Sequence, residues 1–350
     1  MMKGKWIQKN MLVLALSLTI WAGLTATAAA YTDVPAGHWA AESIEKATSL
    51  GLFHGIEEGR FGLGQPITRA EFAATLVRFF GWENAAQTSS YTDVSPDAWY
   101  AAAVETARAN SAVAAAGREF HPEKAVTRAE MASMLLRSLG YTYLAGAASE
   151  YSVPFSDVKV NRGFITLAYD LGLMTGTGEQ RFDPDLPAAR EQAATLLVRV
   201  YDQLETAPVR LNNAAGYRTV SIPTPMAQAG TEIPITPLEP LTDLYAALRR
   251  LRYNEGDMEN VVLRLTAGGV RTLTGEDGAM TSVILTAAEV REALALPDAK
   301  TYYSEQYESA YCIYQPSAHQ TATLWYQSSE SMAAKLQLAQ LFGVDRYLLE

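Results

Sequence analysis

Residues 66–81 read PITRAEFAATLVRFFG, and residues 125–140 read AVTRAEMASMLLRSLG. A third, altered copy at residues 187–201 reads PAAREQAATLLVRVY. An aromatic-x-Asp-Val segment lies upstream of each copy: YTDV at Tyr31, YTDV at Tyr91 and FSDV at Phe155. Segments that recur in one order along a chain are typical of repeat proteins. We therefore predict three tandem repeats.

Each repeat has the pattern of two helices joined by a loop. In the first copy, apolar residues such as Ile44 and Leu50 recur at helical spacing. A glycine-containing turn and a loop with a phenylalanine follow, and the second helix begins at the TRAE tetrad. Two short helices cannot bury both of their apolar faces alone, so three units should pack around a shared centre. The expected fold of this region is an all-α pseudo-trimer of helix-loop-helix units.

The TRAE tetrad has the form of a capping box, in which a hydroxyl and a carboxylate satisfy N–H groups at a helix start. This predicts a capping role for four residues: Thr68, Glu71, Thr127 and Glu130. The third tetrad begins with Ala189 and so loses the hydroxyl. A cap does not require the arginine, whose planar fork suits a carboxylate or phosphate near the positive end of the helix dipole.

With these motifs in one order, the chain from Tyr31 to about Leu204 resembles a tandem of three S-layer homology domains. The resemblance implies binding of a secondary cell-wall polymer, in some cases pyruvylated, in grooves between repeats. Carried over, it makes the tetrad arginines, the Asp of the opening segment and the Trp of the first helix candidate polymer-binding residues. These are Asp33, Trp39, Arg69, Asp93, Trp99, Arg128, Asp157 and Arg190. The third repeat has no such Trp, so we expect one or two working grooves.

Some of these residues have a second interpretation. A Trp such as Trp39 or Trp99 can stack on a sugar face, but it can equally belong to the core. Asp33 and Asp93 can equally be local turn or helix caps.

The N-terminus has the pattern of a secretory signal peptide. Lys3 and Lys5 precede an apolar run from Met11 to Leu24, and small residues suited to cleavage follow. The alternative is an anchor that remains attached, but the run is shorter than the roughly 20 residues that span a bilayer. We expect no permanent membrane span. The lone cysteine, Cys312, excludes an intramolecular disulfide, which suits a Gram-positive surface.

Charge and composition narrow the choice of partners. The chain has 28 Lys and Arg against 38 Asp and Glu, a net charge of -10, which repels nucleic acid and anionic lipid. Hydrophobic residues make up 49% of the chain, as in ordinary globular proteins. The four histidines do not cluster at ligand spacing, and we expect neither a metal nor a cofactor.

The C-terminal third predicts an α/β domain with a small antiparallel insert. Residues 241–253 have the pattern of an amphipathic helix, and a buried strand is expected from Asn260. A capped helix should follow Thr286, and a strand pair, a helix and a final strand should follow Ser309. The domain plan is a signal peptide (1–30), repeats at 31–82, 91–140 and 154–204, a linker (205–218) and the α/β domain (219–350).

Segments from Thr219 onward are similar to the last third of the (β/α)8 barrel of family 18 glycoside hydrolases. The similarity rests mainly on the segment LWYQSSESMAAKLQLAQLFGV. That family needs a DxxDxDxE motif, whose Glu protonates the leaving oxygen. The sequence lacks the motif, and Met226–Ala229 stands where the family has Tyr and Asp. About 130 residues follow Thr219, against roughly 250 for a complete barrel. The resemblance therefore implies a partial, non-catalytic barrel.

Together these patterns predict a secreted protein held non-covalently on the cell wall by its repeats. Two other functions remain open: a wall-anchored hydrolase acting on glycans that contain N-acetylglucosamine, and a structural S-layer subunit.

Overall fold

The computed structural model describes residues 31–84, 89–114, 117–211, 218–219, 231–255, 258 and 261–350. The expected signal peptide and the segment Met226–Ala229 lie outside these residues. Within them, no helix has both the length and the apolar character needed to cross a membrane. The chain divides into two compact units, one ending at Glu205 and the other beginning at Thr206.

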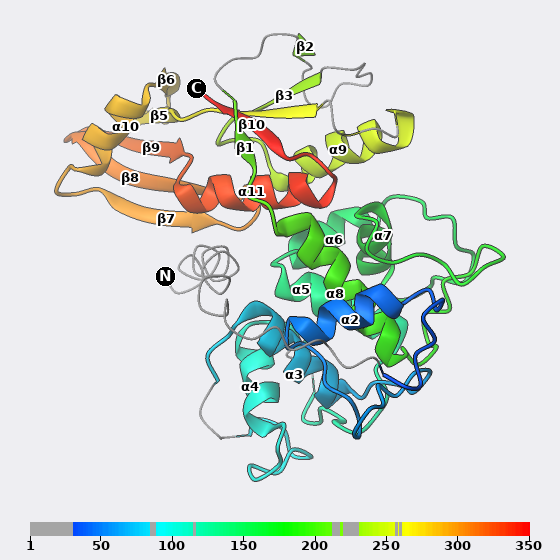
Figure 1. Ribbon diagram of the computed structural model, residues 1–350. Helices are drawn as coiled ribbons and strands as arrows, with labels where there is room; N and C mark the ends of the chain where they lie inside the picture. Colours follow the sequence, from blue (N-terminus) through cyan, green and yellow to red (C-terminus); the bar gives the residue numbers. More distant parts are fainter. Residues whose placement is uncertain are drawn as a thin grey trace, which may run out of the picture. The chain divides into compact units, whose positions relative to one another are not determined.

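In the N-terminal unit, each repeat has the predicted pair of helices (Figure 1). The first helices are α2 (Ala41–Ser49), α4 (Ala101–Ala109) and α7 (Arg162–Asp170). The second helices are α3 (Arg69–Phe80), α5 (Arg128–Ser138) and α8 (Arg190–Leu204), and each begins at the tetrad arginine. A further short helix, α6 (Thr142–Ala148), follows α5 and was not predicted from the sequence.

Two of the three second helices have complete capping boxes. The Thr68 hydroxyl accepts a hydrogen bond from the Glu71 N–H, and the Glu71 carboxylate accepts one from the Thr68 N–H at 2.8 Å. Thr127 and Glu130 form the same pair at the start of α5. At Ala189 only the second half exists, because Gln192 Oε1 accepts from the Ala189 N–H at 3.2 Å. The expected loss of the hydroxyl cap in the third repeat is thus confirmed.

Backbone hydrogen bonds join the three repeats in a ring just before their second helices. Ile67 N donates to Ala188 O at 3.0 Å, Ala188 N to Val126 O at 2.8 Å, and Val126 N to Ile67 O at 2.9 Å. All three residues are fully buried. Each repeat therefore contacts both others at a common centre.

The turn after the first helix needs a left-handed residue in every repeat. Gly51 and Gly172 supply it with φ of 68° and 70°, and Ser111 takes φ of 62° at the same place in the second repeat. A residue with a Cβ is strained in this region. The second repeat forms the same turn with a serine, so its backbone is strained at Ser111.

The C-terminal unit contains a parallel sheet in the order β2-β3-β4-β10-β1. The strands are β1 (Val209–Arg210), β2 (Arg218–Thr219), β3 (Thr231–Ile235), β4 (Val261–Leu265) and β10 (Arg346–Leu349). Helix α9 (Leu241–Glu255) connects β3 to β4, and α11 (Ser329–Leu341) leads into β10. Val209 and Arg210, assigned to the linker from sequence, instead pair in parallel with β10 and form one edge of this sheet.

A second, antiparallel sheet is inserted between β4 and α11, in the order β6-β5-β9-β8-β7. Its strands are β5 (Gly269–Gly275), β6 (Met280–Leu285), β7 (Lys300–Ser304), β8 (Ser309–Ser317) and β9 (Gln320–Tyr326). Helix α10 (Ala287–Leu294) covers one face, where Cys312 and Leu324 are fully buried. The predicted strand pair is confirmed as β8 and β9, whereas β5, β6 and β7 were not predicted.

Candidate functional site

The Asp of each opening segment fixes the loop of its own repeat. The Asp33 carboxylate accepts hydrogen bonds from the N–H groups of Phe61 and Gly62 at 2.8 Å and of Leu63 at 3.0 Å. Asp93 and Asp157 each accept two equivalent bonds, at 2.7–2.9 Å. These bonds span 25 to 30 residues, so the three carboxylates are neither local turn caps nor helix caps.

Burial raises the pKa of these carboxyls, but the backbone N–H donors lower it more, so each pKa lies below its usual value of 3.8. All three are therefore ionised at neutral pH. Each carboxylate therefore stabilises the loop by accepting hydrogen bonds from its backbone N–H groups.

The phenylalanine of each loop lies between an aromatic residue and an arginine. In the second repeat, the Phe120 ring packs against Tyr91 at 5.4 Å, and the Arg69 guanidinium lies 4.9 Å from its centre. Phe182 has Phe155 and Arg128 as the same neighbours, and Phe61 has Tyr31 and Arg190. Each arginine thus reaches the loop of the next repeat in cyclic order.

Hydrogen bonds strengthen this contact between repeats. Arg69 Nε donates to Phe120 O at 2.8 Å, Arg128 Nε to Phe182 O at 2.8 Å, and Arg190 Nε to Phe61 O at 3.0 Å. Arg128 also donates to Thr175 O, and Arg190 to His54 O. The tetrad arginines therefore join one repeat to the next, a role that the sequence interpretation missed because it depends on how the repeats pack.

Exposure separates the three arginines. Arg128 is 5% exposed and Arg190 is 7% exposed, so both guanidinium groups are nearly enclosed by protein. Arg69 has a side chain that is 17% exposed, and its Nη1 forms an ion pair with Glu130 Oε1 at 2.9 Å. Of the three, Arg69 has the most contact with solvent.

The tetrad glutamates have a second partner besides the helix cap. Glu130 pairs with Arg69 of the preceding repeat, and Glu71 pairs with Arg190 at 3.5 Å. The third repeat has Gln192 at this position, so it offers Arg128 no tetrad carboxylate. The three contacts between repeats are therefore chemically different.

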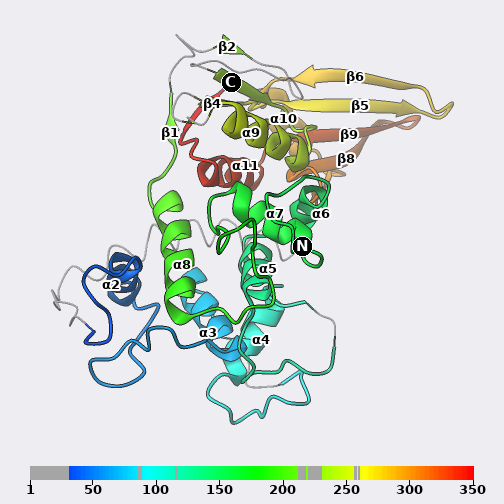
Figure 2. The ribbon, with the colours of Figure 1, turned by 90° about the vertical axis from the view of Figure 1, so that its right-hand side faces the viewer.

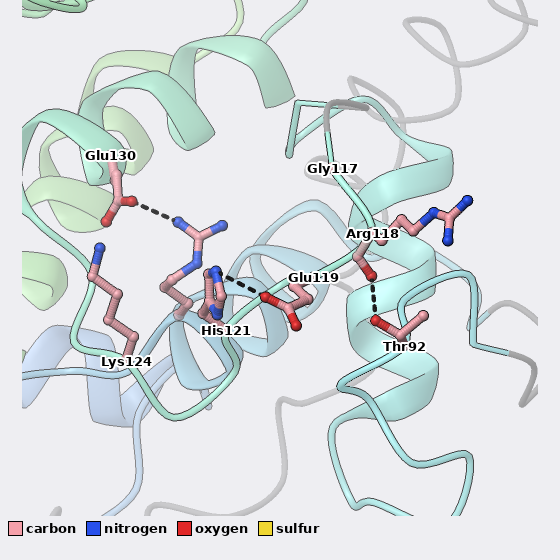
Figure 3. A pocket seen from close by; sticks show the side chains of 8 residues that line it. Thr92, Gly117, Arg118, Glu119, His121, Lys124 and Glu130 are labelled. Atoms are coloured by element: carbon pink, nitrogen blue, oxygen red, sulfur yellow. Dashed lines mark hydrogen bonds and ion pairs between the residues drawn. The ribbon is translucent and has the colours of Figure 1, made fainter.

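A groove with a volume of about 600 Å³ lies between the first and second repeats (Figure 3). It is lined by Arg69, Thr92, Gly117, Arg118, Glu119, His121, Lys124 and Glu130. Lys124 and Glu130 lie on one side of the view, and Arg118 and Thr92 lie on the other. The lining thus contains three cations, Arg69, Arg118 and Lys124, and two carboxylates, Glu119 and Glu130. The Arg118 side chain extends away from both carboxylates in this view.

The helix N-terminus beside this groove already has protein partners. Arg69 N donates to Lys124 O at 2.9 Å, and Ala70 N donates to Pro122 O at 3.0 Å. Side chains, and not the first N–H groups of α3, must therefore supply any contact with an anion in the groove.

A family model described as "S-layer homology domain" matches residues 30–73, 90–132 and 154–194. Each match covers one structural repeat from its opening segment into its second helix. The N-terminal unit is a tandem of three S-layer homology domains.

Two known surface proteins are similar to part of this chain. The S-layer protein EA1 of Bacillus anthracis is 30% identical over 239 residues, which cover 64% of this chain and 26% of that protein. The middle cell wall protein of Brevibacillus brevis is 35% identical over 144 residues, 39% of this chain and 14% of that protein. The chain spans at most about a quarter of the length of the curated relatives it matches. S-layer homology domains and these relatives support a secreted protein anchored at the cell wall or S-layer surface.

One solved structure with a partial likeness is the spore cortex-lytic enzyme SleL of Bacillus cereus. The TM-score is 0.30 at 11% identity, over 34% of this chain and 30% of that chain. A likeness at this TM-score says nothing about the activity of the C-terminal unit.

The two tryptophans that precede first helices in the S-layer homology tandem, Trp39 and Trp99, lie on its surface, whereas Trp82 is buried. Trp39 is 61% exposed and Trp99 is 68% exposed, which excludes the core interpretation. Each precedes its first helix by two residues, and Val160 has the same place before α7. Neither tryptophan lines the groove beside Arg69. In the part of the chain that the structure describes, no cluster of three or more His, Cys, Asp or Glu could hold a metal ion.

Proposed function

We propose that the S-layer homology tandem folds as a pseudo-trimer and anchors the protein by binding a secondary cell-wall polymer in the groove at Arg69. The observation that carries this proposal is the partly exposed Arg69–Glu130 ion pair in a groove with an excess of cations. An anionic group on the polymer, such as a pyruvate ketal, would compete with Glu130 for the Arg69 guanidinium. Lys124, on the same side of the groove as Glu130, would contact a further acidic group.

The equivalent positions of the other two contacts are less suited to this role. Arg128 and Arg190 donate to two backbone carbonyls each and are almost buried. A ligand that reached either guanidinium would have to displace carbonyl oxygens of the fold. We therefore assign Arg128, Arg190 and the three opening aspartates a supporting role, with Trp39 and Trp99 as exposed candidates for sugar contacts outside this groove.

Co-sedimentation of the mature chain with purified cell walls tests the proposal. Arg69→Ala and Lys124→Ala should weaken adsorption by roughly tenfold each, the effect of losing about 1.4 kcal/mol of binding energy. Lys159→Ala, an exposed change in the third repeat, is the matched control. Walls stripped chemically of their secondary polymer should bind none of the proteins. If both groove variants adsorbed like the wild type, this groove would not be the polymer-binding site.

For the C-terminal unit we propose a role without glycoside hydrolase activity. The support is the sequence, in which the DxxDxDxE motif of the resembled family does not occur. Incubation of the mature chain with N-acetylglucosamine oligomers and with peptidoglycan should give no products. If the protein did release products, and replacing an acidic residue, as in Glu308→Gln, abolished this turnover, the C-terminal unit would be a hydrolase.

A further inference from the structure

Strand β6 forms one edge of the antiparallel sheet (Figure 2). Its inner side pairs with β5, from Met280 opposite Thr274 to Leu285 opposite Gly269. Among the residues that the structure describes, no strand pairs with its outer side. Met280 is 71% exposed and Ile284 is 81% exposed, although both are large apolar side chains. The strand thus offers hydrogen-bonding groups and apolar side chains together.

The edge lacks the usual protection against pairing with another chain. Natural edge strands carry lysine, proline or a bulge for this purpose. No charged residue and no proline lies between Ala279 and Ala288, whereas β7 at the opposite edge begins with Lys300. In a chain with a net charge of -10, the absence of charge along this strand removes one source of repulsion between two copies.

The exposed face of the sheet carries an apolar row that runs up to this edge. Tyr302 stacks on Tyr311 at 5.2 Å, and Tyr311 stacks on Trp325 at 4.7 Å. Trp325 lies opposite Val270, which in turn lies opposite Ile284. The row crosses five strands and ends at the unpaired side of β6.

We propose that β6 pairs antiparallel with β6 of a second copy of this chain, around a twofold axis at Ser282. This register places Ile284 opposite the partner subunit's Met280, so the two most exposed side chains of the strand cover each other. Gly275 N donates to Ala279 O at 2.9 Å, and ladder bonds alternate along an antiparallel pair. The N–H and C=O groups of Met280, Ser282 and Ile284 therefore face outward, as this pairing requires.

Sedimentation velocity of the mature chain over a range of concentrations tests the association. The wild type should shift from monomer to dimer as concentration rises. Ile284→Lys, which places a charge on the edge, should remain monomeric with an unchanged melting temperature. Thr301→Lys places the same charge on β7 and should dimerise like the wild type. A wild type that stays monomeric throughout, or an Ile284→Lys variant that dimerises equally well, would overturn the proposal.

Oxidative cross-linking tests the register. Ser282→Cys places one thiol of each copy on the axis, within the span of a disulfide. The natural Cys312 is fully buried and so does not compete. Disulfide-linked dimer should form on the order of tenfold faster or more with Ser282→Cys than with Thr301→Cys, because pairing raises the effective concentration. Equal rates for the two variants would exclude the register.

Discussion

Replacement of Arg128 by alanine tests whether the tetrad arginines hold the repeats together. The side chain is 5% exposed, and its guanidinium donates to Phe182 O at 2.8 Å and to Thr175 O at 2.7 Å. Both bonds come from a charged group, and such bonds contribute roughly 1.5–3 kcal/mol each. Arg128→Ala would leave two carbonyl oxygens and the face of Phe182 without their partner.

The cost of burying the cation offsets part of this gain. Burial lowers the pKa of Arg128, which shows that removal from water disfavours its charged form, although nearby Asp183 and Asp157 act the other way. We therefore expect Arg128→Ala to lower the free energy of unfolding of the N-terminal unit by about 3 kcal/mol, as for other broken buried charge contacts. Arg69→Ala loses one carbonyl contact and a partly exposed ion pair, and should cost about 1.5 kcal/mol, roughly half of the loss expected for Arg128→Ala.

Hydrogen exchange of the protein, measured by mass spectrometry on peptides from α5 and α8, detects these changes as lost protection. Arg60→Ala, which removes an exposed pair with Glu57, is the control and should stay within about 0.5 kcal/mol of the wild type. The reasoning would be refuted if Arg128→Ala lowered the free energy of unfolding by less than about 1 kcal/mol, or if Arg69→Ala lowered it more than Arg128→Ala. Wall adsorption should show the opposite order among variants that remain folded.

Three further predictions concern single residues. Ser111→Gly should raise the stability of the second repeat by about 0.5–1 kcal/mol, because glycine adopts the φ of 62° at this position without strain. Ser111→Ala should give no gain, and chemical denaturation of both variants measures the difference. Ala189→Thr should restore the missing hydroxyl cap of α8 and add about 0.5–1 kcal/mol, and unchanged protection of the α8 amides would contradict this. Burial raises the pKa of Glu308 to about 7, so the folded state keeps a proton that the unfolded state loses above its ordinary value of 4.5. The free energy of unfolding therefore falls as pH rises from about 4.5 to 7. Glu308→Gln can still accept the hydrogen bond from Tyr303, so it should add about 2 kcal/mol to this free energy at pH 8 and nothing at pH 4. Hydrogen exchange of β8 peptides at the two pH values measures the difference.

Features that depend on local sequence were predicted well. The TRAE tetrads gave the starts and caps of α3 and α5, because a capping box involves only four consecutive residues. The same pattern at Thr286 gave the start of α10. Apolar spacing located α9 and α11 within a few residues. The short helix α6 and the β5–β6 hairpin were missed, since neither has a strong periodic pattern of its own.

The candidate site was predicted as a set of residues, but not in its roles. The aspartates and arginines singled out from sequence do lie near the contacts between repeats, yet most of them bind backbone groups of distant loops. The sequence cannot show this, because the Asp33 and Arg190 contacts with the first loop join residues 28 and 129 positions apart. The groove at Arg69 likewise depends on residues from two repeats.

The sequence by itself determined three repeats, their paired helices, the caps and the weakness of the third cap. These follow from hydrogen bonds and apolar spacing within a few turns of chain. Tertiary structure alone decided which arginine is exposed, because nearly identical tetrads meet different neighbours: Glu130 at Arg69, but enclosing carbonyls at Arg128. Burial and charge pairing depend on what surrounds a residue in space, and a repeated motif does not encode that difference.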